Sequence, residues 1–351
     1  MLRANYSLVS ASYVLSLAIL AGCSCKEPHL SPTQIGNWLE SAEIRGVPRS
    51  NAVSFTIGDI AYVGTGYNST VSPGRINDRL NDFWSFNTDS GWKQVQSLPA
   101  PPRSNAVAFG LGSFGYVGTG YDGVKMYNDF YQYDPSLNQW TIKNTFPGEA
   151  RYDAVGFAVK GNGYIGTGYN GNWLNDFYQY DPQQDKWVLT IGTSGDLSKR
   201  RGATVFVYHD KAYLLGGSRD ASMTKDFWSF DPTQPAPWLR LGDLINDNTS
   251  TKDDGYTDIQ REYAVTFVNG DSAYLTLGEN IQPLATTWVY DFVHDQWARR
   301  TAYHRQVRVG AVAFTIKGRS FVGTGGPGPN STMTYDDFDE FLPNQPYNAN
   351  N

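Results

Sequence analysis

Six arginines recur along the chain, each just before a short apolar stretch that contains an alanine. They are Arg49, Arg103, Arg151, Arg201, Arg261 and Arg308. A guanidinium group can grip a carboxylate or phosphate through two parallel hydrogen bonds, so a set of arginines could bind an anion. Guanidinium groups about 8 Å apart would, however, repel by about 2 kcal/mol per neighbouring pair at an effective dielectric of about 20. The arginines therefore need partners.

Aspartates at a fixed place in the same repeated units are the obvious partners. They are Asp82, Asp129, Asp176, Asp226 and Asp337. Two interpretations follow: a repeated structural ion pair, or an open ring of cations for an anionic ligand. The first is favoured, and it predicts that Arg49, Arg103, Arg151, Arg201 and Arg308 pair with the aspartates of their own units.

The fifth unit departs from this pattern. Thr286 and Thr287 stand where the other units have an aspartate, so the sequence predicts that Arg261 has donors free for an incoming carboxylate. Glu262 follows this arginine, Glu279 replaces a glycine or tyrosine, and a long loop precedes the unit. The alternative is that the unit has degenerated without a function.

Three tyrosines follow the glycine-rich part of the first three units: Tyr67, Tyr121 and Tyr169. They are expected at the rim of the same face as the arginines, where they could contact a sugar or a peptide. Ordinary packing of the rim is the alternative interpretation.

The elements that position these residues repeat six times at a period near 50 residues. Each unit has an arginine with an apolar stretch, a glycine-rich stretch such as "GYVGTGY", an aromatic stretch such as "NDFYQY", and a tryptophan. Each part is short, alternating and rich in aromatic or β-branched residues, which predicts four antiparallel strands per unit. No tryptophan follows the sixth aromatic stretch, but Trp38 precedes the first arginine. We therefore predict an all-β, six-bladed propeller that an N-terminal strand closes, with Trp38 beside the strand near Phe338.

The double-glycine strand, the aromatic stretch and the tryptophan at this period resemble the Kelch repeat over residues 36–343. The resemblance implies a Kelch β-propeller of the galactose oxidase superfamily, in which such arginines can capture acidic peptides. Copper radical oxidases of this kind need a cysteine–tyrosine crosslink, but the two cysteines lie at positions 23 and 25, outside the repeats. The histidines (His29, His209, His294 and His304) lack metal-ligand spacing. We therefore expect no metal and no cofactor.

The N-terminus predicts a membrane anchor. A charged start and a short apolar run end in "LAGC", which resembles the bacterial lipobox. The resemblance implies a signal peptide over residues 1–22, lipid on Cys23, a tether over 23–35 and a location in the bacterial cell envelope, in or on the outer membrane. Residues 344–351 are expected to form a C-terminal tail.

The composition narrows the function further. The net charge of −6 argues against nucleic-acid binding, and 40% hydrophobic residues are typical of a globular chain. The sequence predicts a monomeric binding module for a glycan, a small anionic ligand or a protein partner, at the mouth where the first strands begin. The alternative is a metal-independent sugar mutarotase of the N-acetylneuraminate type, which the family resemblance also suggests. In that case Arg261 with Glu262 or Glu279 would supply the acid–base chemistry.

Overall fold

The computed structural model describes residues 32–69, 78–190, 197–245, 256, 258–329 and 331–350. Cys23, the expected signal peptide, most of the expected tether and most of the long loop before the fifth unit lie outside the described residues. Within the described ranges, no helix is long and apolar enough to cross a membrane.

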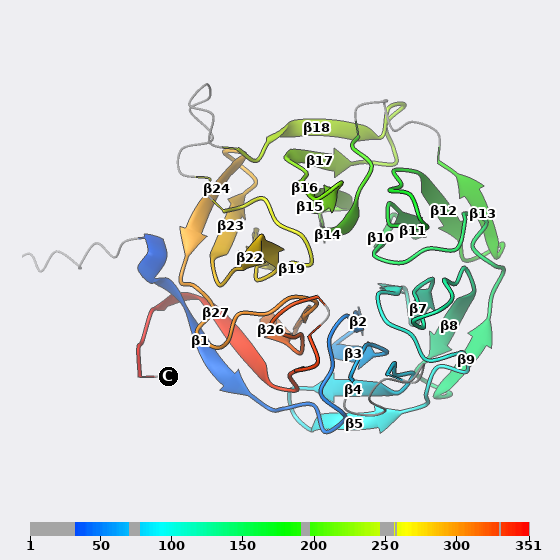
Figure 1. The fold of residues 1–351 in the computed structure, drawn as a ribbon, viewed down its shortest axis with the longest axis horizontal. Helices are drawn as coiled ribbons and strands as arrows, with labels where there is room; N and C mark the ends of the chain where they lie inside the picture. Colours follow the sequence, from blue (N-terminus) through cyan, green and yellow to red (C-terminus); the bar gives the residue numbers. More distant parts are fainter. Residues whose placement is uncertain are drawn as a thin grey trace, which may run out of the picture.

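Six antiparallel sheets surround a central channel like the blades of a propeller (Figure 1). The strands of the first three blades are β2 (Val53–Ile57), β3 (Ile60–Gly64), β4 (Phe83–Asn87) and β5 (Gly91–Val95); β6 (Val107–Leu111), β7 (Phe114–Gly118), β8 (Phe130–Asp134) and β9 (Gln139–Ile142); and β10 (Val155–Val159), β11 (Asn162–Gly166), β12 (Phe177–Asp181) and β13 (Lys186–Leu189). The prediction of an all-β, six-bladed propeller is confirmed.

The later blades carry small additions. Their strands are β14 (Arg201–Tyr208), β15 (Lys211–Arg219), β16 (Ser222–Met223), β17 (Asp226–Phe230) and β18 (Trp238–Asp243); β19 (Val265–Asn269), β20 (Ser272–Thr276), β21 (Glu279–Asn280), β22 (Gln282–Pro283), β23 (Thr287–Asp291) and β24 (Gln296–Arg300); and β25 (Val312–Ile316) and β26 (Arg319–Gly323).

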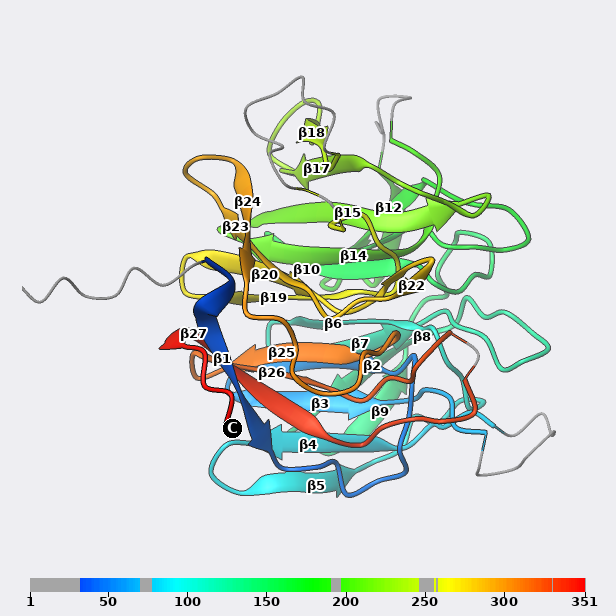
Figure 2. The ribbon, with the colours of Figure 1, turned by 60° about the vertical axis from the view of Figure 1, so that its left-hand side comes forward.

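The N-terminal strand closes the ring, as predicted. A short 3-10 helix, η1 (Pro32–Gln34), leads into β1 (Ile35–Ser41), which pairs with β27 (Phe338–Pro346) on the outside of the sixth blade (Figure 2). Trp38 lies opposite Phe341 in this pairing. Because the first and last strands share one sheet, the two ends of the propeller are held together.

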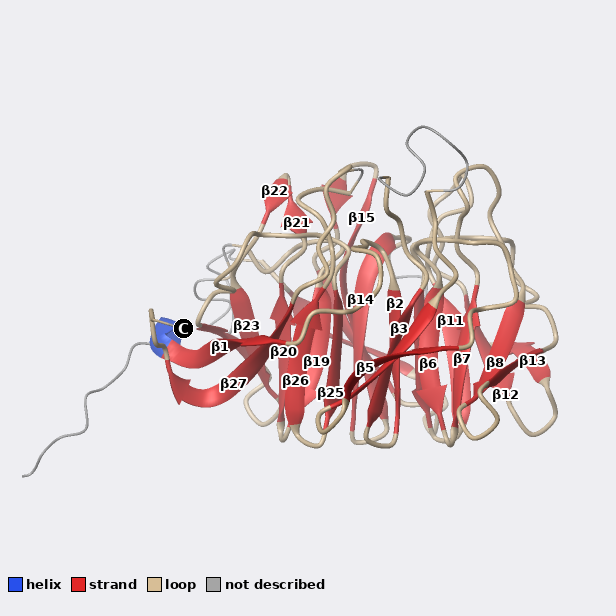
Figure 3. Cartoon of the chain, turned by 90° about the horizontal axis from the view of Figure 1, so that it is seen from below, coloured by secondary structure: helices blue, strands red, loops and turns tan. Residues whose placement is uncertain are grey.

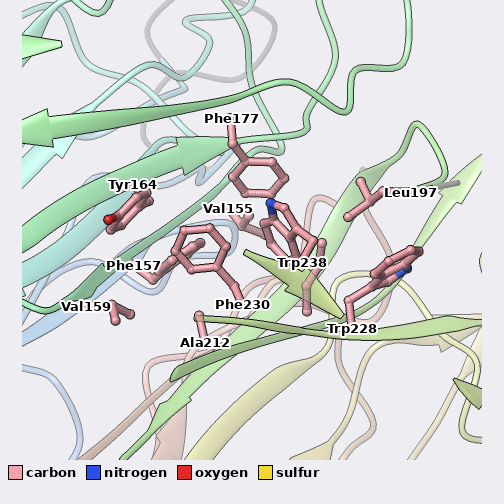
Figure 4. Close-up of a cluster of buried hydrophobic side chains, with 11 residues drawn as sticks. Val155, Phe157, Val159, Tyr164, Phe177, Leu197, Ala212, Trp228, Phe230 and Trp238 are labelled. Carbon is pink, nitrogen blue, oxygen red and sulfur yellow. The ribbon is translucent and has the colours of Figure 1, made fainter. Parts of the chain in front are cut away.

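The tryptophans fill the wedges between blades, so the core consists of separate clusters rather than one. Trp140 packs on Phe83 of the preceding blade with ring centroids 4.9 Å apart. Trp238 lies in the same way beside Phe177, at 4.7 Å, and also contacts Phe230 of its own blade (Figure 4). A single blade exposes both of its faces, and these contacts bury them against its neighbours.

The two faces of the propeller differ in their loops. On one face the first and second strands join through tight hairpins such as residues 58–59 between β2 and β3. The other face carries the longer connections between second and third strands, including β21 and β22 (Figure 3). We call the opening of the channel on this second face the mouth.

Candidate functional site

Below the mouth lies a layer of buried arginines, one in each blade, that we call the clasp arginines: Arg49, Arg103, Arg151, Arg200, Arg261 and Arg308. All six are at most 1% exposed. Arg49 shows the usual geometry, with Nη1 and Nη2 each donating to a carboxylate oxygen of Asp82 over 2.8 Å. Its Nε donates to the carbonyl oxygen of Val47 over 3.1 Å. The predicted pairing is confirmed for Arg49, Arg103, Arg151 and Arg308, with Asp82, Asp129, Asp176 and Asp337.

The glycine-rich turn of each unit serves its clasp arginine. Thr65 and Gly66 have φ angles of 59° and 107°, and this left-handed turn lets the Thr65 carbonyl accept from Arg49 Nη1 over 3.1 Å. The Gly66 amide then donates to the carbonyl of Arg103 in the next blade over 2.8 Å. A Cβ on Gly66 would lie 2.9 Å from the Ser50 carbonyl oxygen, so glycine is needed here. Each clasp therefore joins neighbouring blades.

The fourth blade corrects the prediction for Arg201. Arg200, not Arg201, is the clasp arginine, and it donates to Asp226. Arg200 precedes Ala203 by three residues, the same spacing that separates Arg49 from Ala52. Two adjacent arginines obscured this register, because the repeat was aligned on the second of them. Arg201 instead begins β14 and pairs with Ser218 in β15.

The prediction that Arg261 has free donors is wrong for its two Nη atoms, whereas its buried Nε has no acceptor among the described residues. Its Nη1 donates to the carbonyls of Leu277 and Thr286 over 2.9 and 3.1 Å, and its Nη2 donates to Thr286 Oγ1 over 2.8 Å and to the Asp258 carbonyl. Carbonyl and hydroxyl oxygens thus replace the aspartate in direct contact, while the Asp258 carboxylate lies 3.7 Å from Nη2. Burial lowers the pKa of Arg261 to about 10. Ligand binding by Arg261 and the other clasp arginines stays a prediction. Their burial disfavours such binding.

A closed ring of six backbone hydrogen bonds lies above the clasp layer. Its members each follow a clasp arginine by two residues: Asn51, Asn105, Asp153, Gly202, Tyr263 and Gly310. The amide of each donates to the carbonyl of the member in the preceding blade, over 2.8 to 3.3 Å. All six have φ angles between 52° and 64°, a conformation that suits Gly, Asn and Asp. Tyr263 is the exception, so a feature other than local preference holds it there.

The contact that holds Tyr263 is a hydrogen bond to another blade. Its hydroxyl donates to Asp153 Oδ2 over 2.9 Å, and Asn105 Nδ2 donates to Asp153 Oδ1 over 2.5 Å. The tyrosine ring passes beside Gly202, where a Cβ would lie 3.1 Å from Tyr263 Cε1. Burial raises the pKa of Asp153 to about 6 despite these donors. The Asp153–Tyr263 contact links the third and fifth blades beneath the mouth.

A pocket of about 400 Å³ opens above this ring. Most of its lining is polar or aromatic. It contains two arginines, four carboxylic acids and four tyrosines: Arg79, Arg201, Asp78, Asp153, Glu262, Glu279, Tyr67, Tyr121, Tyr152 and Tyr263. The pocket lies on the face that the sequence indicated. It also brings together Arg201, Glu262, Glu279, Tyr67 and Tyr121 from the predicted set.

Arg201 differs from every clasp arginine in its ion pairing, since each of the six clasp arginines has an aspartate oxygen at ion-pair distance. Among the described residues it makes no ion pair, and its Nε is buried without a hydrogen-bond acceptor. Its guanidinium carbon lies 5.4 Å from the centre of the Tyr169 ring, a cation–π contact. Although burial acts in the opposite direction, nearby acidic groups including Asp153 and Glu262 raise the pKa of Arg201. The group is therefore a cation whose Nε donor is unused among the described residues.

Glu262 and Glu279 form the acidic wall of the pocket. Their backbones pair through two hydrogen bonds of 2.9 Å, which holds the residues side by side at the start of β21. Ser218 Oγ donates to Glu262 Oε2 over 2.5 Å. Burial raises the pKa of both carboxylic acids, and the charge of Glu262 raises that of Glu279 further. Both can hold a proton at a higher pH than an exposed glutamate.

Aromatic rings and a second arginine form the opposite wall. Arg79 lies over the rings of Tyr67 and Tyr121, with its guanidinium carbon 4.9 and 5.6 Å from their centres. Tyr169 does not line the pocket but supports Arg201 from beneath. Sequence reasoning missed Arg79, Asp78, Asp153, Tyr152 and Tyr263. For the last three, the available signal was the variation between repeats one and two residues after the clasp arginine.

No group of three or more histidine, cysteine, aspartate or glutamate residues that could hold a metal ion occurs in the described ranges.

A comparison with models of protein families found no match, and neither did a comparison with curated protein sequences. Among solved structures, one described as "Structure of YjhT" is similar, with a TM-score of 0.68 and 16% sequence identity. The match covers 84% of this chain and 95% of that chain, and it shows a shared propeller fold.

Proposed function

We propose that the pocket at the mouth binds a small anionic molecule of the sugar-acid type. One observation carries the proposal: Arg201 presents a guanidinium group to the pocket without an ion pair among the described residues. A partly buried cation with unused donors is stabilised when a carboxylate binds to it. The clasp arginines lack this property because their Nη donors are already used.

The rest of the lining suits a hydroxylated ligand. Tyr67, Tyr121 and Tyr152 offer ring surfaces, on which the apolar face of a sugar can pack. Asp78 is 8% exposed and its Oδ1 accepts no hydrogen bond from the described residues, so it can accept from a hydroxyl group. The acidic wall offers further acceptors. Mixed polar and aromatic lining of this kind gives a ligand its orientation as well as its affinity.

Calorimetry on the lipid-free propeller tests the proposal. Galacturonate and N-acetylneuraminate are expected to bind, whereas galactose, which lacks the carboxylate, should bind at least tenfold more weakly. Arg201→Gln should weaken binding of both acids about 10- to 100-fold, because it removes hydrogen bonds to a charged group. Arg219→Gln is the matched control, since Arg219 also lies on this face but has its own ion pair with Asp220 at 3.1 Å. Equal binding of galactose and galacturonate would contradict the proposal.

Glu262 and Glu279 support a second candidate function, a metal-independent sugar mutarotase. Mutarotation needs one group that donates a proton and one that accepts it near the anomeric carbon. Two adjacent carboxylic acids with raised pKa values can share these roles, while Arg201 holds the sugar carboxylate. Anomer exchange of N-acetylneuraminate, followed by NMR, tests this. Catalysis that Glu262→Gln and Glu279→Gln leave unchanged would rule out these residues.

We further propose that lipid on Cys23 anchors this binding module to the bacterial outer membrane, with the propeller acting as a monomer. The lipobox-like "LAGC" sequence supports the anchor. Mass spectrometry of the mature protein should find a diacylglycerol-modified, N-acylated Cys23 at the N-terminus. An unmodified N-terminus at another residue would refute the anchor without affecting the binding proposal.

A further inference from the structure

We infer that the mouth has a second anion-binding point at Arg79, so that its ligand carries two anionic groups, as an acidic disaccharide does. The inference rests on the proposed function, in which Arg201 is the first point. It adds to that function the size and charge pattern of the ligand.

Arg79 resembles Arg201 in its environment. Within the part of the chain that the structure describes, Arg79 makes no ion pair, and its Nε is buried without an acceptor. The guanidinium group is nevertheless held in place, between the rings of Tyr67 and Tyr121. It also packs against Gly123, where a Cβ would lie 3.0 Å from Nη1. A cation that is ordered by its packing and makes no ion pair among the described residues can bind an anion without first breaking such a pair.

A row of aromatic rings connects the two arginines. Tyr121 stacks on Tyr152 with ring centroids 5.2 Å apart, and Tyr152 contacts Tyr169 edge-on at 5.7 Å. Arg79 lies over one end of this row and Arg201 over the other. The two cations therefore lie over different rings of this row and offer two separate points to which anionic groups can bind.

The charges in the pocket match an elongated ligand with anionic groups at both ends. The acidic wall of Glu262 and Glu279 disfavours an anion on its side of the pocket. The two arginines attract anions at the two ends of the aromatic row, where the sugar rings between them can pack. A disaccharide with one carboxylate on each ring satisfies both points, whereas a singly charged monosaccharide leaves one guanidinium group unpaired.

The Nε–Hε NMR signals of the arginines test this directly, once Arg79→Gln and Arg201→Gln have assigned them. Titration with inorganic phosphate should shift both signals. Digalacturonate should shift both at lower concentration and bind at least tenfold more tightly than galacturonate. Arg79→Gln should reduce that advantage to about twofold, the gain expected from having two equivalent rings, while Arg219→Gln should preserve it.

The outcomes separate the inference from the function on which it rests. A shift at Arg201 without one at Arg79 overturns the second point and leaves the proposed function intact. So does a disaccharide that binds no more than twofold more tightly than galacturonate. Absence of a shift at Arg201, with or without a response at Arg79, overturns both.

Discussion

Arg200 and Arg201 are neighbours in the sequence, yet their side chains have opposite surroundings. Arg200 is fully buried, and its donors go to Asp226, Thr224 and two carbonyl oxygens. Arg201 faces the pocket, and its Nε has no acceptor within the described ranges. Arg200 bridges Leu174 directly before β14 begins at Arg201, and successive residues of such extended chain point to opposite sides.

The same division separates two layers of the whole molecule. In the clasp layer all six blades carry an arginine, and the repeated residues around it connect one blade to the next. One residue further along, the six blades carry Ser50, Ser104, Tyr152, Arg201, Glu262 and Val309, and the middle four of these line the pocket at the mouth. Repetition therefore marks residues that build the propeller, and variation at a position facing the mouth marks residues that distinguish one ligand from another.

The largest effect is expected from removing one of the buried clasp arginines. Arg103→Ala should lower the free energy of unfolding by roughly 3–5 kcal/mol, because it leaves Asp129 and the Thr119 carbonyl without their donor. Arg201→Ala should change it by less than about 1 kcal/mol, since no ion pair is lost. Urea unfolding of both variants measures the difference. Equal losses would show that the two layers do not differ in structural role.

The propeller could be predicted from the sequence because its determinants are local and repeated. Six copies of one strand pattern define six blades, and the misplaced Trp38 defines how the ring closes. The clasp pairs with Asp82, Asp129, Asp176 and Asp337 were predictable for the same reason.

The candidate site was predicted less well, because it depends on contacts between blades. The carbonyls that satisfy Arg261 belong to backbone, which carries no mark in the sequence. The Asp153–Tyr263 hydrogen bond joins residues 110 positions apart. Arg79 occupies the place of Met126 and Trp173 in the next two blades, a position at which the repeated units carry unrelated residues. The sequence did allow Arg200 to be identified as the clasp arginine in place of Arg201, because Arg200 has the three-residue spacing to Ala203 that Arg49 has to Ala52.

A second substitution compares the stability that the clasp arginines of the fifth and second blades contribute. Arg261→Ala should cost about 1–3 kcal/mol, less than Arg103→Ala, because it leaves carbonyl groups unpaired but no isolated carboxylate. Asp258 keeps Arg299 at 3.3 Å and the Trp288 indole at 3.1 Å. Thermal and urea unfolding compare the two variants. A loss as large as that of Arg103→Ala would mean that the carbonyl oxygens replace an aspartate fully.

The Asp153–Tyr263 contact predicts a pH effect in the mouth. Because burial raises the pKa of Asp153 to about 6, the folded protein binds a proton here between about pH 4 and 6 that the unfolded chain lacks. Lowering the pH from 7.5 to 5 should therefore add about 1.4 kcal/mol of stability from this group. The raised pKa values of Glu262 and Glu279 act in the same direction.

Asp153→Asn measures how much of this pH-dependent stability comes from Asp153 alone. The variant should gain about 1.4 kcal/mol less than the natural protein over the same pH interval in urea unfolding, while the glutamate contributions remain. An identical pH dependence in the two proteins would contradict a raised pKa at Asp153.

The smallest expected effect comes from giving the fifth blade the aspartate that it lacks. Thr286 occupies the place of Asp82, and its Oγ1 already accepts from Arg261 Nη2 over 2.8 Å. Thr286→Asp should therefore convert a neutral contact into a bidentate ion pair and add about 1 kcal/mol of stability at pH 7, where the new carboxylate is ionised. Since Arg261 would lower the pKa of that carboxyl, the gain should persist down to about pH 4 and vanish below it, when the group is protonated. Urea unfolding at pH 7 and pH 3.5 measures both parts. A destabilised variant at pH 7 would mean that the fifth blade cannot accommodate the clasp of its neighbours, and that its departure from the repeat is fixed by packing.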